Sequence, residues 1–146
     1  MSSFELGTDG PRVIVVGYNG SDTAANALAY ASGLARRQGS SLVIAFASPN
    51  SVLAAMGTTV DTSLAGVTHI IAQDMEHEVK LHLDGTGVSW RFVAGTGDPV
   101  QLLECVAKQV QADAVVVGHS RHQRRLVGSV AIRLVRSAKW PTIVVP

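Results

Sequence analysis

Residues 114–121 of the chain read AVVVGHSR, and residues 128–130 read GSV. The β-branched run that opens the first stretch predicts a strand buried on both faces. A glycine ends this strand, a polar loop follows, and the second stretch begins a helix with a glycine and a serine. Glycines let a ligand approach the backbone closely, and N–H groups at a helix N-terminus carry partial positive charge. The pattern is therefore typical of a phosphate-binding corner in an α/β protein.

A second corner of the same kind lies near the start of the chain. Residues 13–18 read VIVVGY, and residues 19–22 read NGSD before an alanine-rich helix. In a parallel sheet, two strand-to-helix corners of this kind can face each other.

Strand and helix signals alternate along the whole chain, which favours a parallel sheet with crossover helices. Strands are expected at residues 12–17, 41–47, 88–94, 114–118 and 142–145. Helices are expected from Ser21 or Asp22 to Gly39, over 67–83, from the Asp98 cap and Pro99 onward, and over 129–138. The segment 48–66 has no firm period and is expected to be a loop, with one helical turn near 52–56. The strand at 88–94 alternates in polarity and is expected at a half-exposed sheet edge.

Right-handed crossovers restrict how five such strands can be arranged. If the chain runs outward through the first three strands and then crosses back, the order is 3-2-1-4-5. A switch point then opens between the first and fourth strands, where ligands of open α/β sheets bind.

Composition indicates one globular domain, because 47% of the 146 residues are hydrophobic and 16% are charged. Residues 1–11 are expected to be a flexible segment and 12–146 the domain. A net charge of +1 disfavours nucleic acid as a partner, and no apolar run reaches the roughly 18 residues of a membrane span. The one cysteine, Cys105, is expected in the core, and a chain without an internal disulfide fits a reducing cytoplasm.

Five short stretches follow one another along the chain: VVGYNGS at 15–21, GDP at 97–99, ADAVVVG at 112–118, GSV at 128–130 and PTIVV at 141–145. In this order and spacing they resemble the universal stress protein family, over nearly the whole chain from about Arg12 to Pro146. The resemblance implies a single α/β domain with a five-stranded parallel sheet of order 3-2-1-4-5 and helices on both faces, Rossmann-like and of the adenine nucleotide alpha hydrolase type.

The resemblance also implies a cytoplasmic homodimer that forms through the last strand. In one branch of the family it implies ATP or another adenine nucleotide at the switch point, with magnesium only if ATP binds. The nucleotide-binding residues implied here are Gly17, Tyr18, Asn19, Ala47, Val117, Gly118, His119, Ser120, Arg121, Gly128, Ser129 and Val130. The dimer residues implied are Thr142, Ile143, Val144 and Val145.

The second corner departs from the pattern of nucleotide-binding members, which have Gly, two residues, Gly, nine residues, then Gly with Ser or Thr. Here Gly118 matches, but Arg121 replaces the second glycine and Gly128 follows after six further residues. Arg121 either binds phosphate through two N–H groups of its planar guanidinium or fills the cleft. Asn19 occupies the position of a usual aspartate near the base and ribose; it keeps a carbonyl acceptor and adds a donor.

Three functions remain open at this point. The leading interpretation is a non-enzymatic, dimeric stress-response regulator that binds an adenine nucleotide, with a protein partner that the sequence does not identify. The altered loop favours a member that has lost nucleotide binding and acts as a protein-interaction module. A slow phosphohydrolase or weak ATPase is poorly supported, because Asp22 is the one carboxylate close to the first corner. No metal site is expected, because His69, His77 and His82 do not share one helical turn.

Overall fold

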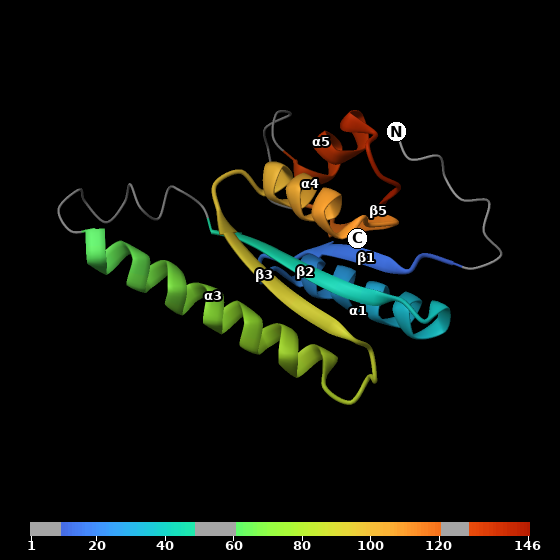
Figure 1. Ribbon diagram of the computed structural model, residues 1–146, viewed down its shortest axis with the longest axis horizontal. Helices are drawn as coiled ribbons and strands as arrows, with labels where there is room; N and C mark the ends of the chain where they lie inside the picture. The colour runs from blue at the N-terminus through green and yellow to red at the C-terminus, as the bar shows by residue number, and fades with distance from the viewer. Residues whose placement is uncertain (1–9, 49–60, 121–128) are drawn as a thin grey trace.

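The protein is a five-stranded parallel β-sheet with helices on both faces (Figure 1). The computed structural model describes residues 10–48, 61–120 and 129–146. Its strand order, β3-β2-β1-β4-β5, confirms the order expected from the sequence. The strands are β1 (Val13–Gly17), β2 (Ser41–Ser48), β3 (Trp90–Thr96), β4 (Ala114–Gly118) and β5 (Thr142–Val145).

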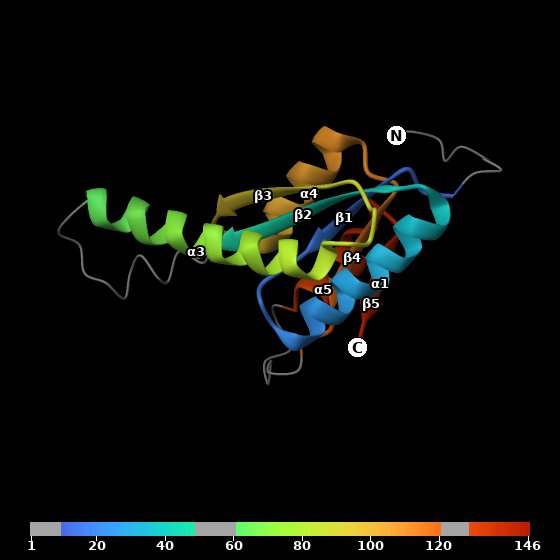
Figure 2. The same ribbon diagram turned by 90° about the horizontal axis from the view of Figure 1, so that it is seen from below.

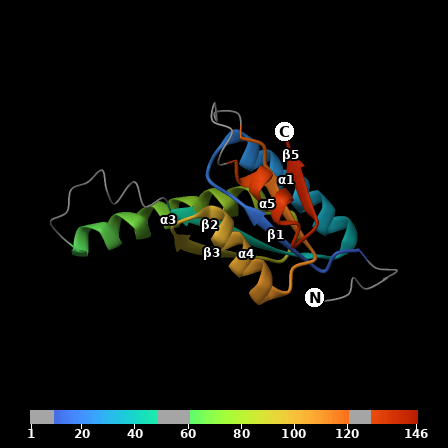
Figure 3. The ribbon, with the colours of Figure 1, turned by 90° about the horizontal axis from the view of Figure 1, so that it is seen from above.

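Two helices pack on each face of the sheet. Helices α1 (Asp22–Gln38) and α3 (Asp61–Leu83) cover one face, which is in front in Figure 2. Helices α4 (Pro99–Val110) and α5 (Val130–Ser137) cover the other face, which is in front in Figure 3. The N-terminal half of α3 extends past the ends of β2 and β3 (Figures 1 and 2).

The central strand β1 contributes to both hydrophobic cores. Ile14 and Val16 face the core under α1 and α3, whereas Val15 faces the core under α4 and α5, and all three are 0% exposed. Alternate side chains of a strand point to opposite faces, so a strand buried on both faces requires a continuous apolar run. Each such side chain stabilises the fold by roughly 1.5–3 kcal/mol relative to exposure.

The helix ends follow the capping signals in the sequence. The Ser21 Oγ accepts the Ala24 N–H at 3.1 Å and begins α1. The Asp98 carboxylate accepts the Gln101 N–H at 3.3 Å and begins α4, with Pro99 as the first helical residue. Helix α1 is capped at its C-terminus by Gly39, whose φ of 70° is left-handed and favours glycine.

Helix α3 is longer than the sequence pattern predicted. It begins at Asp61, within the segment 48–66 that was expected to be a loop. The segment mixes Pro, Asn, Gly and Thr with small apolar residues and has no firm period, but an isolated glycine such as Gly66 costs only about 1 kcal/mol inside a helix and need not end it. Residues 49–60, including the helical turn expected at 52–56, lie outside the described part of the chain.

Two helix side chains, Cys105 and His82, are exposed to solvent. Cys105 is exposed, not in the core, because it falls between the buried Leu103 and Ala107 and points away from the α4 stripe. His82, near the end of α3, is likewise exposed. Strand β3 is at a sheet edge as expected, and it extends to Thr96 because β2 pairs with it as far as Ser48.

Candidate functional site

The two glycine-containing corners end side by side at one edge of the sheet. Strands β1 and β4 are parallel neighbours, with Val16 opposite Val116, so Gly17 and Gly118 end them at the same edge. We call this the carboxyl edge. Ala47 lies near it on β2, two residues beyond Ala45, the partner of Gly17. The predicted switch point between β1 and β4 is therefore present, with both corners on it.

Gly118 is required by the contact between β4 and α1. A Cβ atom at this position would lie 2.5 Å from the carbonyl carbon and oxygen of Thr23 and 2.7 Å from the Ala24 nitrogen. Those atoms are backbone, so they cannot yield as a flexible side chain would. A Cβ at Gly17 would meet only side chains, Val117 at 3.1 Å and Leu103 at 3.3 Å. The first turn of α1 thus packs directly on the end of β4.

Asn19 forms the turn that leads into α1. Its Oδ1 accepts the Ser21 N–H at 3.0 Å, and Gly20 has a φ of +81° in the left-handed region. The side chain of Asn19 is exposed at the carboxyl edge. Its amide nitrogen carries the donors that distinguish it from an aspartate.

Tyr18 turns its side chain away from the edge and into the core under α1 and α3. It is 4% exposed, and its hydroxyl donates to the Glu78 Oε2 at 2.8 Å. Burial, and then this hydrogen bond, raise the pKa of Tyr18 above its usual range. The Tyr18 N–H donates to the Ala45 carbonyl at 3.0 Å. The Tyr18 side chain therefore contacts α3 and does not lie at the carboxyl edge.

The residues after β4 are tied to the last strand. The His119 N–H donates to the Val145 carbonyl at 2.7 Å, and Gly118 is opposite Val145. Val117 is buried in the core under α4 and α5. His119 is exposed and Ser120 is half-buried. Arg121 and Gly128, both predicted as site residues, lie outside the described residues.

Helix α5 offers backbone donors at its start. The Ser129 Oγ caps the helix by accepting the Ile132 N–H at 3.4 Å. The N–H groups of Val130 and Ala131 are in the first turn and have no acceptor within the helix. Such a pair, at the positive end of the helix dipole, favours an anion.

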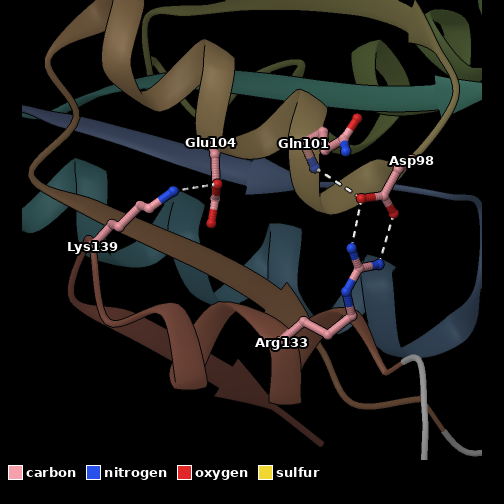
Figure 4. A network of polar contacts seen from close by, with 5 residues as sticks. All are labelled: Asp98, Gln101, Glu104, Arg133 and Lys139. Carbon is pink, nitrogen blue, oxygen red and sulfur yellow. Dashed lines mark hydrogen bonds and ion pairs between the residues drawn. The ribbon is translucent and has the colours of Figure 1, made fainter.

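Two ion pairs connect α4 and its N-cap to α5 and the residues that follow it, as Figure 4 shows. Both Oδ atoms of Asp98 accept hydrogen bonds from the two terminal nitrogens of Arg133, each at 2.7 Å. The hydrogen bonds from Arg133 lower the pKa of Asp98 below its usual range. Lys139 Nζ pairs with Glu104 Oε2 at 2.9 Å. Sequence reasoning identified Asp98 as a cap but missed Arg133, because their separation of 35 residues has no local pattern.

Residues 11–146 match the Universal stress protein family. The chain belongs to this family. The match covers both corners, the GDP stretch at 97–99 and the last strand, and it confirms the resemblance that these stretches predicted.

Solved structures of other universal stress proteins share the fold. A protein of this family from Burkholderia pseudomallei is 24% identical, with a TM-score of 0.69 over 92% of this chain and 95% of that one. A universal stress protein in complex with cAMP is 25% identical, with a TM-score of 0.68 over 92% of this chain and 96% of that one. The Archaeoglobus fulgidus universal stress protein in complex with dAMP is 22% identical, with a TM-score of 0.64 over 93% and 97%. A search of curated proteins found no match.

Other features of this universal stress protein lie away from the carboxyl edge. A surface hollow of about 230 Å³ lies between α1 and the end of α3, and Arg36, His82 and Gly33 are among its lining residues. Across residues 10–48, 61–120 and 129–146, no three His, Cys, Asp or Glu side chains are grouped so as to hold a metal ion. No helix in the described part of the chain is long and apolar enough to cross a membrane.

Proposed function

We propose that this universal stress protein binds an adenine nucleotide at the switch point between β1 and β4 and acts as a non-enzymatic regulator in the cytoplasm. The observation that carries the proposal is that the two glycine-containing corners end the neighbouring strands β1 and β4, both at the carboxyl edge. The complexes of other universal stress proteins with cAMP and dAMP support an adenine nucleotide as the ligand class.

The proposed contacts divide between the two ends of the nucleotide. Asn19 offers its amide to the adenosine, and the first turn of α5 offers the N–H groups of Val130 and Ala131 to phosphate. The remaining proposed contacts are Gly17, the Tyr18 backbone, Ala47, Val117, Gly118, His119, Ser120 and Ser129, together with Arg121 and Gly128. Magnesium would accompany ATP alone, because the corner residues supply few carboxylates.

The test is calorimetric titration with ATP and with adenosine, on the unsubstituted chain and on Val130→Pro. Proline is tolerated at the first helical position, and Ser129 already has the extended backbone that precedes a proline. The substitution therefore removes one N–H donor and leaves the helix in place. We expect ATP affinity to fall by about tenfold or more, the equivalent of one hydrogen bond to a charged group, and adenosine affinity to stay unchanged. No ATP binding by the unsubstituted chain would refute the proposal.

Exposed apolar side chains favour a second function, that of a protein-interaction module. Ile132 is 46% exposed and Val135 is 55% exposed on α5, the helix that follows the altered loop in the sequence. A chain of this kind would bind no nucleotide. Native mass spectrometry of freshly purified protein separates the two functions, since bound AMP or ATP is released and weighed directly.

We also propose that the protein is a homodimer joined through β5. This strand is at the sheet edge, so its outer N–H and C=O groups are not paired within the sheet. Ile143 and Val145 pack against the core under α1 and α3, and Val144 points to the opposite face, 38% exposed. A two-fold contact through Thr142, Ile143, Val144 and Val145 would pair both edges at once.

A further inference from the structure

The Asp98–Arg133 ion pair lies at the carboxyl edge, as the two corners do. Asp98 follows the end of β3 and caps α4, and Arg133 is in the first turns of α5. Helix α4 crosses β2 and β1 on one face, and α5 packs on β4 and β5 on that face. The ion pair therefore connects the N-terminus of α4 to that of α5 across the switch point, on the α4 and α5 side (Figure 4).

We propose that Asp98 and Arg133 together act as a clamp that positions the start of α5 for phosphate binding. The inference rests on the proposed nucleotide site and adds two positioning residues to it. Arg133 also donates its backbone N–H to the Ser129 carbonyl at 3.0 Å. Arg133 thus binds Asp98 through its side chain and binds Ser129, the N-cap of α5, through its backbone N–H.

The geometry gives the clamp a fixed orientation. Two parallel hydrogen bonds of 2.7 Å between a guanidinium and a carboxylate define a plane, which a single lysine contact does not. Asp98 is itself held, because its Oδ2 accepts the Gln101 N–H. The guanidinium also neutralises a carboxylate that would otherwise repel phosphate at this edge.

The second ion pair provides a matched control. Lys139 follows the end of α5, and Glu104 is inside α4, so this pair connects the same part of the fold away from the carboxyl edge. If these ion pairs act only by adding stability, then Arg133→Met and Lys139→Met will change the affinity for ATP equally. A positioning role predicts a difference between them.

The experiment measures ATP affinity by calorimetry for Arg133→Met, Asp98→Asn, the double variant and Lys139→Met. Asparagine remains a good N-cap, so Asp98→Asn removes the charge and leaves α4 capped. We expect both single variants to bind ATP about fivefold more weakly, roughly 1 kcal/mol, and the double variant to lose no more than either single one. Lys139→Met is expected to bind as the unsubstituted chain does.

A second measurement needs no nucleotide. Hydrogen exchange of the Ile132 and Arg133 amides, both bonded to Ser129, should be faster in Arg133→Met and Asp98→Asn and unchanged in Lys139→Met. Unchanged or increased ATP affinity in Asp98→Asn, with weaker binding in Arg133→Met, would mean that Arg133 grips phosphate itself and would overturn the clamp. Equal losses in Arg133→Met and Lys139→Met would overturn it too. If the unsubstituted chain binds no nucleotide, the proposed function fails together with the inference.

Discussion

At the scale of single residues, the same residue type has opposite roles in two places of this fold. Gly118 touches backbone atoms of α1, so it is a steric requirement. Gly33 is in the middle of α1, beside the surface hollow, and a Cβ there would meet nothing within 4 Å. The sequence shows both as glycines and cannot distinguish them, because the distinction depends on atoms of a distant segment.

We therefore expect Gly118→Ala to destabilise the protein. The new Cβ would lie 2.5 Å from the Thr23 backbone, and either β4 or α1 must move. Overpacking of this kind costs about 1–3 kcal/mol. Urea unfolding measures the loss as a lower midpoint at an unchanged slope. A midpoint equal to that of the unsubstituted chain would show that the contact is looser than the structure has it.

At the scale of elements, local signals predicted where most helices begin and long-range contacts decided the remainder. Ser21 and Asp98 cap the helices that the sequence assigned to them, and Ser129 caps the helix expected over 129–138. The predicted start of α3 was wrong because its first residues belong to a segment, 48–66, that has no firm helical period. The hydrogen bond between Tyr18 and Glu78 and the Asp98–Arg133 clamp were missed, since no spacing links residues 60 and 35 positions apart.

The substitution Gly33→Ala tests helix α1 and serves as the control for Gly118→Ala. Alanine in a helix interior is more favourable than glycine by roughly 0.5–1 kcal/mol, and here no atom opposes it. We expect a higher urea midpoint, in the opposite direction from Gly118→Ala. A lower midpoint would indicate that the hollow beside α1 is filled in solution.

At the scale of the whole molecule, the strand order was predictable because right-handed crossovers leave few arrangements of five parallel strands. The position of the candidate site followed from that order. What binds there did not follow, because Arg121 and the shortened loop depart from the family pattern. Of the predicted site residues, Gly17, Asn19, Gly118 and Ser120 are at the carboxyl edge, while the Tyr18 side chain is in the core.

Val144→Lys tests the assembly through β5. A lysine at this position would put an unpaired charge into the proposed interface, at a cost of several kcal/mol. Sedimentation should show a dimer for the unsubstituted chain and a monomer for the variant. Leu81→Lys is the control. Leu81 is 65% exposed on α3, so this substitution should leave the dimer intact. A dimer that survives Val144→Lys would place the interface elsewhere.

The position of β1 at the centre of the sheet has a consequence for the order of events at the ribosome. One edge of β1 pairs with β2, which follows it closely in the chain. The other edge pairs with β4, and the Asp113 carboxylate there accepts the Arg12 and Val13 N–H groups from 101 and 100 residues away. During synthesis from the N-terminus, the side of β1 that pairs with β4 stays unpaired until β4 has left the exit tunnel. The nascent chain therefore carries an unpaired edge on its buried central strand while the residues between β1 and β4 are being made, and an unpaired strand edge of this kind favours aggregation.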